Sequence, residues 1–245
     1  LQASWKIAPA LASGCSLVMK PSEITPLTTI RVFELMEEIG FPKGVINLVL
    51  GKGSEIGEVM SSHKEVDLVS FTGGIQTGKH IMKQAADHVT NVALELGGKN
   101  PNVIFDDADF DVAVDQALNG AYFHAGQVCS AGSRIIVHNS IKDKFEQTLI
   151  DRAKKIKVGN GFDDDTEMGP LISAEHREKV ENYIDIAKEE GATIATGGKR
   201  PDREDLQDGF FFEPTVITDC DTSMRIVQEE VFGPVVTVEG FDTEE

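Results

Sequence analysis

The chain has few cysteines and no long apolar run. Its three cysteines, Cys15, Cys129 and Cys220, are widely spaced along 245 residues and form neither a CxxC pair nor a Cys/His cluster. This argues against a zinc site and against a disulfide-stapled secreted domain, and we expect a reducing, cytoplasmic compartment. No apolar run approaches the length of a membrane span, so we expect no membrane partner.

Positive charge is also scarce. The chain carries 23 basic and 41 acidic residues, which gives a net charge of −18 and argues against a nucleic acid partner. An acidic surface would suit a cationic ligand, but more often it only keeps a protein in solution. The composition is otherwise that of a globular protein, long enough for one large domain or two modest ones.

Cys129 lies in the stretch FHAGQVCSAGSR (residues 123–134), among small and polar neighbours. A cysteine that only fills a core usually has branched apolar neighbours. Gly126 and Gly132 would leave room for a substrate, and nearby backbone amides could stabilise a thiolate. The stretch therefore indicates a nucleophile, although a small residue at a tight strand–helix junction would have the same surroundings.

Glu95 is the one acidic residue in the apolar stretch VALELGGKN (residues 92–100). A carboxylate buried in such a run without a partner would be costly, and that environment suits a general base. The alternative is a glutamate at a strand end that simply reaches water.

Strands and helices are expected to alternate along the chain, which indicates parallel sheets covered by helices. Pro26 should open a helix behind Thr25 as its N-cap. The other expected helices cover 3–13, 109–121, 140–156 and 174–190, with one more beginning near Thr77. The expected strands cover 15–20, 45–50, 66–71, 92–96, 103–105, 134–138, 192–196 and 210–217.

Several motifs together resemble those of the aldehyde dehydrogenase superfamily, in the family's order and spacing. They are KPSE (20–23), FTGG (71–74), ELGGK (95–99), GQVC (126–129) and EEVFGP (229–234). The segments WKIAPAL, CSLVMKPSEITPLT and GQVCSAGSR are most similar in sequence to the betaine aldehyde dehydrogenases. The resemblance covers essentially the whole chain.

The resemblance implies an α/β fold with a Rossmann-like NAD-binding sheet at 1–97 and an α/β catalytic domain at 98–245, both partial. It implies that Cys129 attacks an aldehyde, that hydride passes to NAD, and that Glu95 activates water to release a carboxylic acid. Complete members are longer at both ends and form homo-oligomers. The family's oxyanion asparagine would precede residue 1, so we expect this segment alone to be inactive.

The cofactor contacts combine residue chemistry with the resemblance. Lys20 and Glu23 follow a strand, where a lysine and a glutamate can bind ribose hydroxyls, and the resemblance assigns them to the adenosine ribose. Glu23 would repel a 2′-phosphate, which favours NAD over NADP. The alternative is a turn whose charges face solvent. The remaining expected contacts are Pro21, Ser22, Gly53, Gly57, Gly74, Ile75, Gln76, Thr77, Leu96, Gly97, Glu230 and Phe232.

The residues themselves support some of these predicted cofactor contacts more strongly than others. The loop with Gly53 and Gly57 has one residue too many for GxGxxG, yet it offers backbone amides at a helix start. Gly74 to Thr77 suit phosphate for the same reason, although a glycine-rich turn without a ligand is the alternative. The roles of Glu230 and Phe232 beside the nicotinamide ribose come from the resemblance alone.

Further assignments follow only from the betaine aldehyde dehydrogenases. The lysine that matches Lys6 has a charge-relay role there, and its glutamate partner would follow residue 245. Some members bind potassium mostly through backbone carbonyls, and the matching positions are Ile24 and Val89. A quaternary ammonium substrate favours an aromatic cage, for which this chain offers Trp5, Tyr122 and Phe123.

Two other functions stay open. A succinate semialdehyde dehydrogenase would need a basic residue for the second carboxylate, and only Arg134 is available in the Cys129 stretch. The second open function is that of a non-catalytic relative that serves as a binding protein. The presence of both Cys129 and Glu95 argues against it. His124 could pair with Cys129, although we expect it to be structural.

Overall fold

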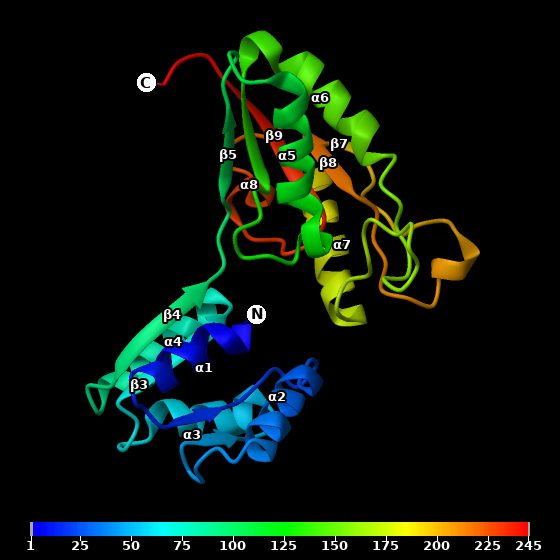
Figure 1. Cartoon of the computed structure of the whole chain (residues 1–245). Coiled ribbons are helices and arrows are strands. Elements are labelled where there is room, and N and C mark those ends of the chain that lie inside the picture. Colours follow the sequence, from blue (N-terminus) through cyan, green and yellow to red (C-terminus); the bar gives the residue numbers. More distant parts are fainter. Residues whose placement is uncertain (1, 245) are drawn as a thin grey trace. The chain divides into compact units, whose positions relative to one another are not determined.

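The computed structural model describes residues 2–244, and the chain divides into two compact units, Leu1–Leu96 and Gly97–Glu245 (Figure 1). Hereafter they are unit 1 and unit 2. Both are mixtures of helices and strands in which most neighbouring strands run parallel, as expected. Within residues 2–244, no helix is both long and apolar enough to cross a bilayer.

Unit 1 contains two separate pairs of parallel strands. β1 (Leu17–Met19) pairs with β2 (Ile46–Leu48), and β3 (Leu68–Gly73) pairs with β4 (Asn91–Leu96). A parallel pair needs a crossover connection, and a helix lies between the two strands of each pair in the sequence. The helical segments of the unit are α1 (Gln2–Ala12), α2 (Leu27–Glu38), the π-helical turn η1 (Gly53–Gly57), α3 (Glu58–Ser62) and α4 (Ile75–Ala86).

Two helix starts differ from the expectation. The predicted N-cap at Thr25 is wrong: Pro26 occupies the cap position of α2, and no side chain caps the helix. α4 begins at Ile75 rather than near Thr77, because Gly74 has an extended backbone and the helical turn starts immediately after it. Helix ends depend on such local backbone angles, which apolar spacing does not specify.

Unit 2 is built on a five-stranded sheet with the order β5-β6-β9-β8-β7. Only the β7–β8 pair is antiparallel. The strands are β5 (Pro101–Ile104), β6 (Arg134–His138), β7 (Thr193–Thr196), β8 (Thr215–Thr218) and β9 (Val235–Phe241). The helical segments are α5 (Phe110–Tyr122), η2 (Phe123–Gly126), α6 (Asn139–Ala153), α7 (Ala174–Glu189), η3 (Glu204–Leu206) and α8 (Arg225–Gln228).

Two strands of this sheet differ from the sequence prediction. β9 was not predicted at all, although it lies between β6 and β8. Its first five residues are all buried, so it lacks the alternation that marks a half-exposed strand. β8 begins only after Pro214, which has no backbone N–H to donate to a ladder, whereas the predicted strand began at Phe210.

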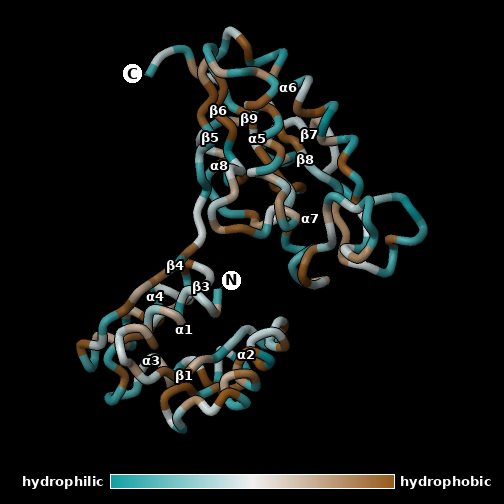
Figure 2. The backbone as a smooth tube through the Cα atoms, viewed as in Figure 1, coloured by the Kyte–Doolittle hydropathy of each residue, from teal (hydrophilic) through white to brown (hydrophobic). Residues whose placement is uncertain are grey.

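Helices α5, α6 and α7 cover the sheet with apolar residues at helical spacing, as predicted for α5 and α6. α5 buries Val114, Ala117 and Ala121, while Phe145 and Leu149 of α6 are fully buried. The sheet strands carry the hydrophobic colours in Figure 2. The resulting core contains only residues of unit 2.

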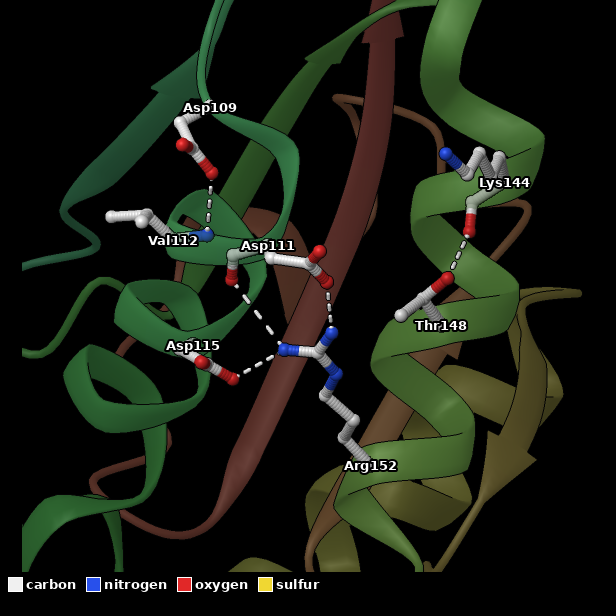
Figure 3. Close-up of polar contacts among 7 residues, drawn as sticks. All are labelled: Asp109, Asp111, Val112, Asp115, Lys144, Thr148 and Arg152. Atoms are coloured by element: carbon white, nitrogen blue, oxygen red, sulfur yellow. Dashed lines mark hydrogen bonds and ion pairs between the residues drawn. The ribbon is translucent and has the colours of Figure 1, made fainter.

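Polar contacts fix α5 and α6 side by side (Figure 3). Asp109 caps α5 by accepting a hydrogen bond from the Val112 amide at 3.2 Å. On α6, Arg152 donates to the carboxylates of Asp111 and Asp115 on α5. These carboxylates are exposed, so the ion pairs add little stability and mainly set the register of the two helices.

Candidate active site

The Cys129 loop begins at the C-terminal end of α5 with a sharp change of direction. His124 and Ala125 adopt left-handed backbone angles, with φ of 51° and 54°, and Gly126 follows with φ of 69°. A Cβ at Gly126 would overlap the carbonyl of Gly233, so a glycine is required there. The turn therefore packs the Cys129 loop, backbone against backbone, onto the segment EEVFGP.

Cys129 itself is half-buried, and main-chain hydrogen bonds shape its loop. The Ala131 amide donates to the Val128 carbonyl at 3.0 Å, and the Gly132 amide donates to the Gly120 carbonyl at 3.1 Å. The side chain of Asn100 donates to the Cys129 carbonyl at 2.7 Å. Sequence reasoning missed Asn100, because an asparagine after a glycine turn carries no local signal of a contact 29 residues away.

An open hollow lies beside this loop. Its lining consists of Asn119, Gly120, Phe123, Val128, Ser130 and Ala131. The Phe123 ring is 62% exposed, so it is free to contact a bound molecule. The Tyr122 ring cannot contact a bound molecule, because it is buried in the core and its hydroxyl donates to the Thr215 carbonyl at 3.0 Å. The suggestion that Tyr122 could join an aromatic cage is therefore wrong.

The segment EEVFGP lies against the Gly97–Gly98 turn. The Glu230 carboxylate accepts a hydrogen bond from the Gly98 amide at 3.3 Å. A Cβ at Gly97 would overlap that carboxylate, so a side chain on this turn would displace Glu230. A small enclosed pocket between the motifs is lined by Gly98, Gly126, Val128, Ala131, Ser133, Glu230, Val231, Phe232, Gly233 and Val235.

One face of α7 determines the shape of the segment from Glu229 to Gly233. A ring nitrogen of His176, Nε2, lies 2.6 Å from the Phe232 carbonyl, and the Tyr183 hydroxyl donates to Glu229 at 2.8 Å. A Cβ at Gly233 would come within 2.7 Å of Val180. These three α7 residues share a helix face. Phe232 has a φ of 59°, a strained conformation that such contacts must maintain.

Burial affects the ionisable groups on this face. It lowers the pKa of His176, while the Phe232 carbonyl acts in the opposite direction. The hydrogen bond to a carbonyl requires a proton on Nε2, and His176 can provide it while neutral. Burial, together with Glu229, raises the pKa of Tyr183 to about 12. The donor side chain of each contact is therefore uncharged near neutral pH.

In unit 1, Lys20 and Glu23 form a connected group just after β1. Lys20 Nζ donates to the Pro21 carbonyl at 2.7 Å, to the Gly51 carbonyl at 3.3 Å and to Glu23 at 3.4 Å. Glu23 also accepts from the Gly53 amide at 3.5 Å, and backbone hydrogen bonds lower its pKa. The charges at this strand end thus contact one another as well as solvent, and Ser22 lies exposed between them.

The expected phosphate-binding segments lie at two helical starts. Gly53 and Gly57 bound the η1 turn that leads into α3. Gly74 precedes α4, whose first residues, Ile75, Gln76 and Thr77, are exposed. The amides at the start of a helix have no intrahelical partner, so α4 offers unpaired donors to an anion.

Glu95 lies on β4 opposite Thr72 and is exposed. The expected burial is wrong, because β4 alternates and Glu95 lies on its exposed face, whereas Leu96 is half-buried. Lys6 of α1 lies within electrostatic reach of Glu95 and donates to the Ser70 hydroxyl at 3.0 Å. Burial lowers the pKa of Lys6, while Glu95 acts in the opposite direction. Glu95 and Cys129 belong to different units, so their cooperation stays a prediction.

The two positions predicted for potassium are both in unit 1. Ile24 lies in the turn after β1, and Val89 follows α4 with a φ of 55°. Both side chains are hydrocarbons without a ligand atom, so only their backbone carbonyls could bind the ion. Within residues 2–244 no group of three or more His, Cys, Asp or Glu could hold a metal ion. The potassium site stays a prediction.

Lys99 and Cys220 are half-buried residues of unit 2 for which the sequence predicted no chemistry. Burial lowers the pKa of Lys99 to about 8, and its Nζ has no hydrogen-bond partner among the described residues. Burial likewise raises the pKa of the Cys220 thiol to about 12. A thiol that resists ionisation is a poor nucleophile, which agrees with a structural role for Cys220.

The comparisons with known proteins concern the whole chain. The sequence model of the Aldehyde dehydrogenase family matches residues 1–245. The chain belongs to the aldehyde dehydrogenase family. It is 66% identical over 245 residues to the betaine aldehyde dehydrogenase of Bacillus subtilis, covering 100% of this chain and 50% of that protein. It is 49% identical to the peroxisomal aminoaldehyde dehydrogenase 1 of Pisum sativum, of which it covers 48%.

A solved structure gives the same picture for the aldehyde dehydrogenase fold. Betaine aldehyde dehydrogenase from Staphylococcus aureus, in complex with NAD+, superposes with a TM-score of 0.98 at 85% identity. The match covers 99% of this chain and 48% of that one. The chain therefore has the family's fold, and it spans about half the length of the relatives it matches.

Proposed function

We propose that a polypeptide containing this chain oxidises an aldehyde to a carboxylic acid with NAD, and that betaine aldehyde is its substrate. One observation carries the proposal. In unit 2 the Cys129 loop lies beside an open hollow and packs against the segment holding Glu230 and Phe232. The proposed nucleophile Cys129 and the proposed cofactor-side carboxylate of Glu230 thus lie on two segments of unit 2 that pack against each other.

Residues of this chain take part in each step of the proposed reaction. Cys129 attacks the aldehyde carbonyl as a thiolate, and its backbone amide stabilises the oxyanion that forms. NAD, when bound, would supply the hydride acceptor, so that the adduct on Cys129 would be oxidised to a thioester. Glu95 then removes a proton from water, which hydrolyses the thioester and frees the carboxylic acid. Exposure of Glu95 on β4 leaves its carboxylate accessible to that water.

The chain also offers groups that fit NAD. The Lys20–Glu23 pair can bind ribose hydroxyls, and the unpaired amides at the start of α4 suit the pyrophosphate. Glu230 and Phe232 would hold the nicotinamide side beside the Gly97–Gly98 turn. The carboxylate of Glu23 favours NAD over NADP. The complex of the Staphylococcus relative with NAD+ supports the same cofactor.

Two features favour a cationic aldehyde. The hollow beside Cys129 presents the exposed ring of Phe123, and aromatic faces attract quaternary ammonium groups. Arg134, the one basic residue of the Cys129 stretch, is bound by both oxygens of Glu239 at 2.6 and 2.9 Å. It is therefore not free for a substrate carboxylate, which argues against a semialdehyde. Names of the similar proteins support betaine aldehyde or an aminoaldehyde.

The same proposal includes features of the complete protein. The resemblance supports a homo-oligomer, a charge-relay role for Lys6 and a potassium ion on the carbonyls of Ile24 and Val89, while the scattered cysteines favour the cytoplasm. Light scattering tests the oligomeric state, and activity with potassium replaced by sodium tests the ion.

The experiment measures NADH formation from betaine aldehyde, an aminoaldehyde, propanal and succinate semialdehyde. It uses the complete polypeptide that carries these residues and, in parallel, the 245-residue chain. We expect the complete polypeptide to prefer betaine aldehyde. A preference for another aldehyde would overturn the substrate, and a failure with every aldehyde would support a non-catalytic binding protein.

A further inference from the structure

Asn100 connects the Gly97–Gly98 turn to the Cys129 loop. Its backbone carbonyl accepts from the Arg134 amide at 3.3 Å, at the point where β5 and β6 begin to pair. This hydrogen bond to β6 therefore fixes the main chain of Asn100. Its side chain extends back to the loop and donates to the carbonyls of Cys129 at 2.7 Å and Ala131 at 3.3 Å.

The two contacts use the whole donor capacity of the side chain. An amide nitrogen carries two hydrogens, and both acceptors are carbonyl oxygens of the loop. The orientation of the amide follows from this, because the side-chain oxygen would repel the same two carbonyls. On the opposite side, the loop is fixed to α5 by the hydrogen bond from Gly132 to Gly120.

We propose that Asn100 is a positioning residue for the Cys129 nucleophile. Its hydrogen bond fixes the carbonyl of Cys129, and with it the backbone angle ψ that sets how the thiol and the Cys129 amide are directed. The chemical meaning of this proposal rests on the proposed function, in which Cys129 is the nucleophile. The predicted effect belongs to the chemical step and not to cofactor binding.

Asn100→Asp gives the sharpest variant. The new side chain has nearly the same shape, but an ionised carboxylate only accepts hydrogen bonds, so it would repel both carbonyls. Asn102→Asp is the matched control. It adds the same charge two residues later, inside β5, where the asparagine lies near Gly132 but makes no side-chain hydrogen bond to the loop within the described part of the chain. Asn100→Ser retains a single donor and tests partial rescue.

The experiment measures kcat, the KM for NAD, the rate at which iodoacetamide alkylates Cys129, and the melting temperature of the complete polypeptide. We expect Asn100→Asp to lower kcat by about tenfold to a hundredfold, because the Cys129 carbonyl loses the donor that fixes it. Alkylation should change with it, whereas the KM for NAD should stay near its original value. Asn100→Ser should fall between Asn100→Asp and the original protein.

The opposite results are equally clear. Equal kcat and equal alkylation in Asn100→Asp and Asn102→Asp would overturn the proposal, as would a lower melting temperature with no change in kcat. If Asn100→Asp does not fold, Asn100→Ser carries the test, and an unchanged kcat there would overturn it. Absence of turnover in the unmodified protein would instead count against the proposed function, while the alkylation rates would still test Asn100.

Discussion

The two units carry similar elements but are packed very differently. Unit 2 surrounds its sheet with helices and buries large side chains such as Phe145, Leu149 and Phe212. Unit 1 consists of two strand pairs, and many of its apolar residues are exposed, including Leu27 at 77% and Ile39 at 75%. Parallel strands are stable when both faces are covered. The proposed nucleophile thus lies in a well-packed unit, whereas Lys20 and Glu23, which we propose bind the adenosine ribose, lie in a sparsely packed one.

The largest expected effect is on turnover, when the proposed nucleophile of unit 2 is replaced. Replacing Cys129 by alanine removes the attacking group, so we expect kcat to fall by a factor on the order of 10⁴ or more. The measurement is NADH formation by the complete polypeptide. Cys220→Ala is the control, because that thiol is part of the packing and should be dispensable for turnover. Comparable losses in the two variants would contradict the assignment of Cys129.

The difference in packing predicts unequal responses to large-to-small substitutions. Phe145→Ala should lower the free energy of unfolding of the 245-residue chain by about 3–5 kcal/mol, because it leaves a cavity in the core. Leu27→Ala in unit 1 should change it by less than about 0.5 kcal/mol, since the leucine is mostly exposed. Urea denaturation followed by fluorescence and circular dichroism measures both. Equal losses would mean that the two units are equally packed.

A smaller effect is expected at the contact of α7 with Phe232. His176→Leu leaves the Phe232 carbonyl without its donor and should cost about 1–3 kcal/mol. Hydrogen exchange of the amides from Glu229 to Gly233 should accelerate, since the strained φ of Phe232 loses its support. His176→Gln can still donate and should restore slow exchange. His80→Leu, an exposed histidine of unit 1, is the control and should leave this segment unchanged.

The smallest effect concerns pH and Lys99. Its pKa is about 8 in the folded chain against 10.5 in the unfolded one, so the unfolded state binds the proton more tightly. The free energy of unfolding should therefore rise with pH between these values through Lys99. Lys99→Met should remove that rise. Denaturation from pH 7 to 9 tests this in the two proteins, which share Cys220, and parallel curves would contradict it.

The sequence predicted most helices and strands of both units because apolar spacing follows the faces that are buried. It missed β9, whose first five residues are all buried without alternation, and it placed Glu95 in a buried position that the alternation of β4 exposes. Asn100 and His176 were missed for a different reason. Their partners are backbone carbonyls 29 and 56 residues away, and a carbonyl leaves no trace in residue identity.

The most direct test joins the two units in one reaction. Glu95→Gln, made in the complete polypeptide, should still allow Cys129 to react but should slow hydrolysis of the thioester. After incubation with NAD and the preferred aldehyde, mass spectrometry should find the acyl group on the peptide that contains Cys129, with about one NADH formed per protein chain. Continued turnover at the original rate with no acyl group on Cys129 would contradict the account.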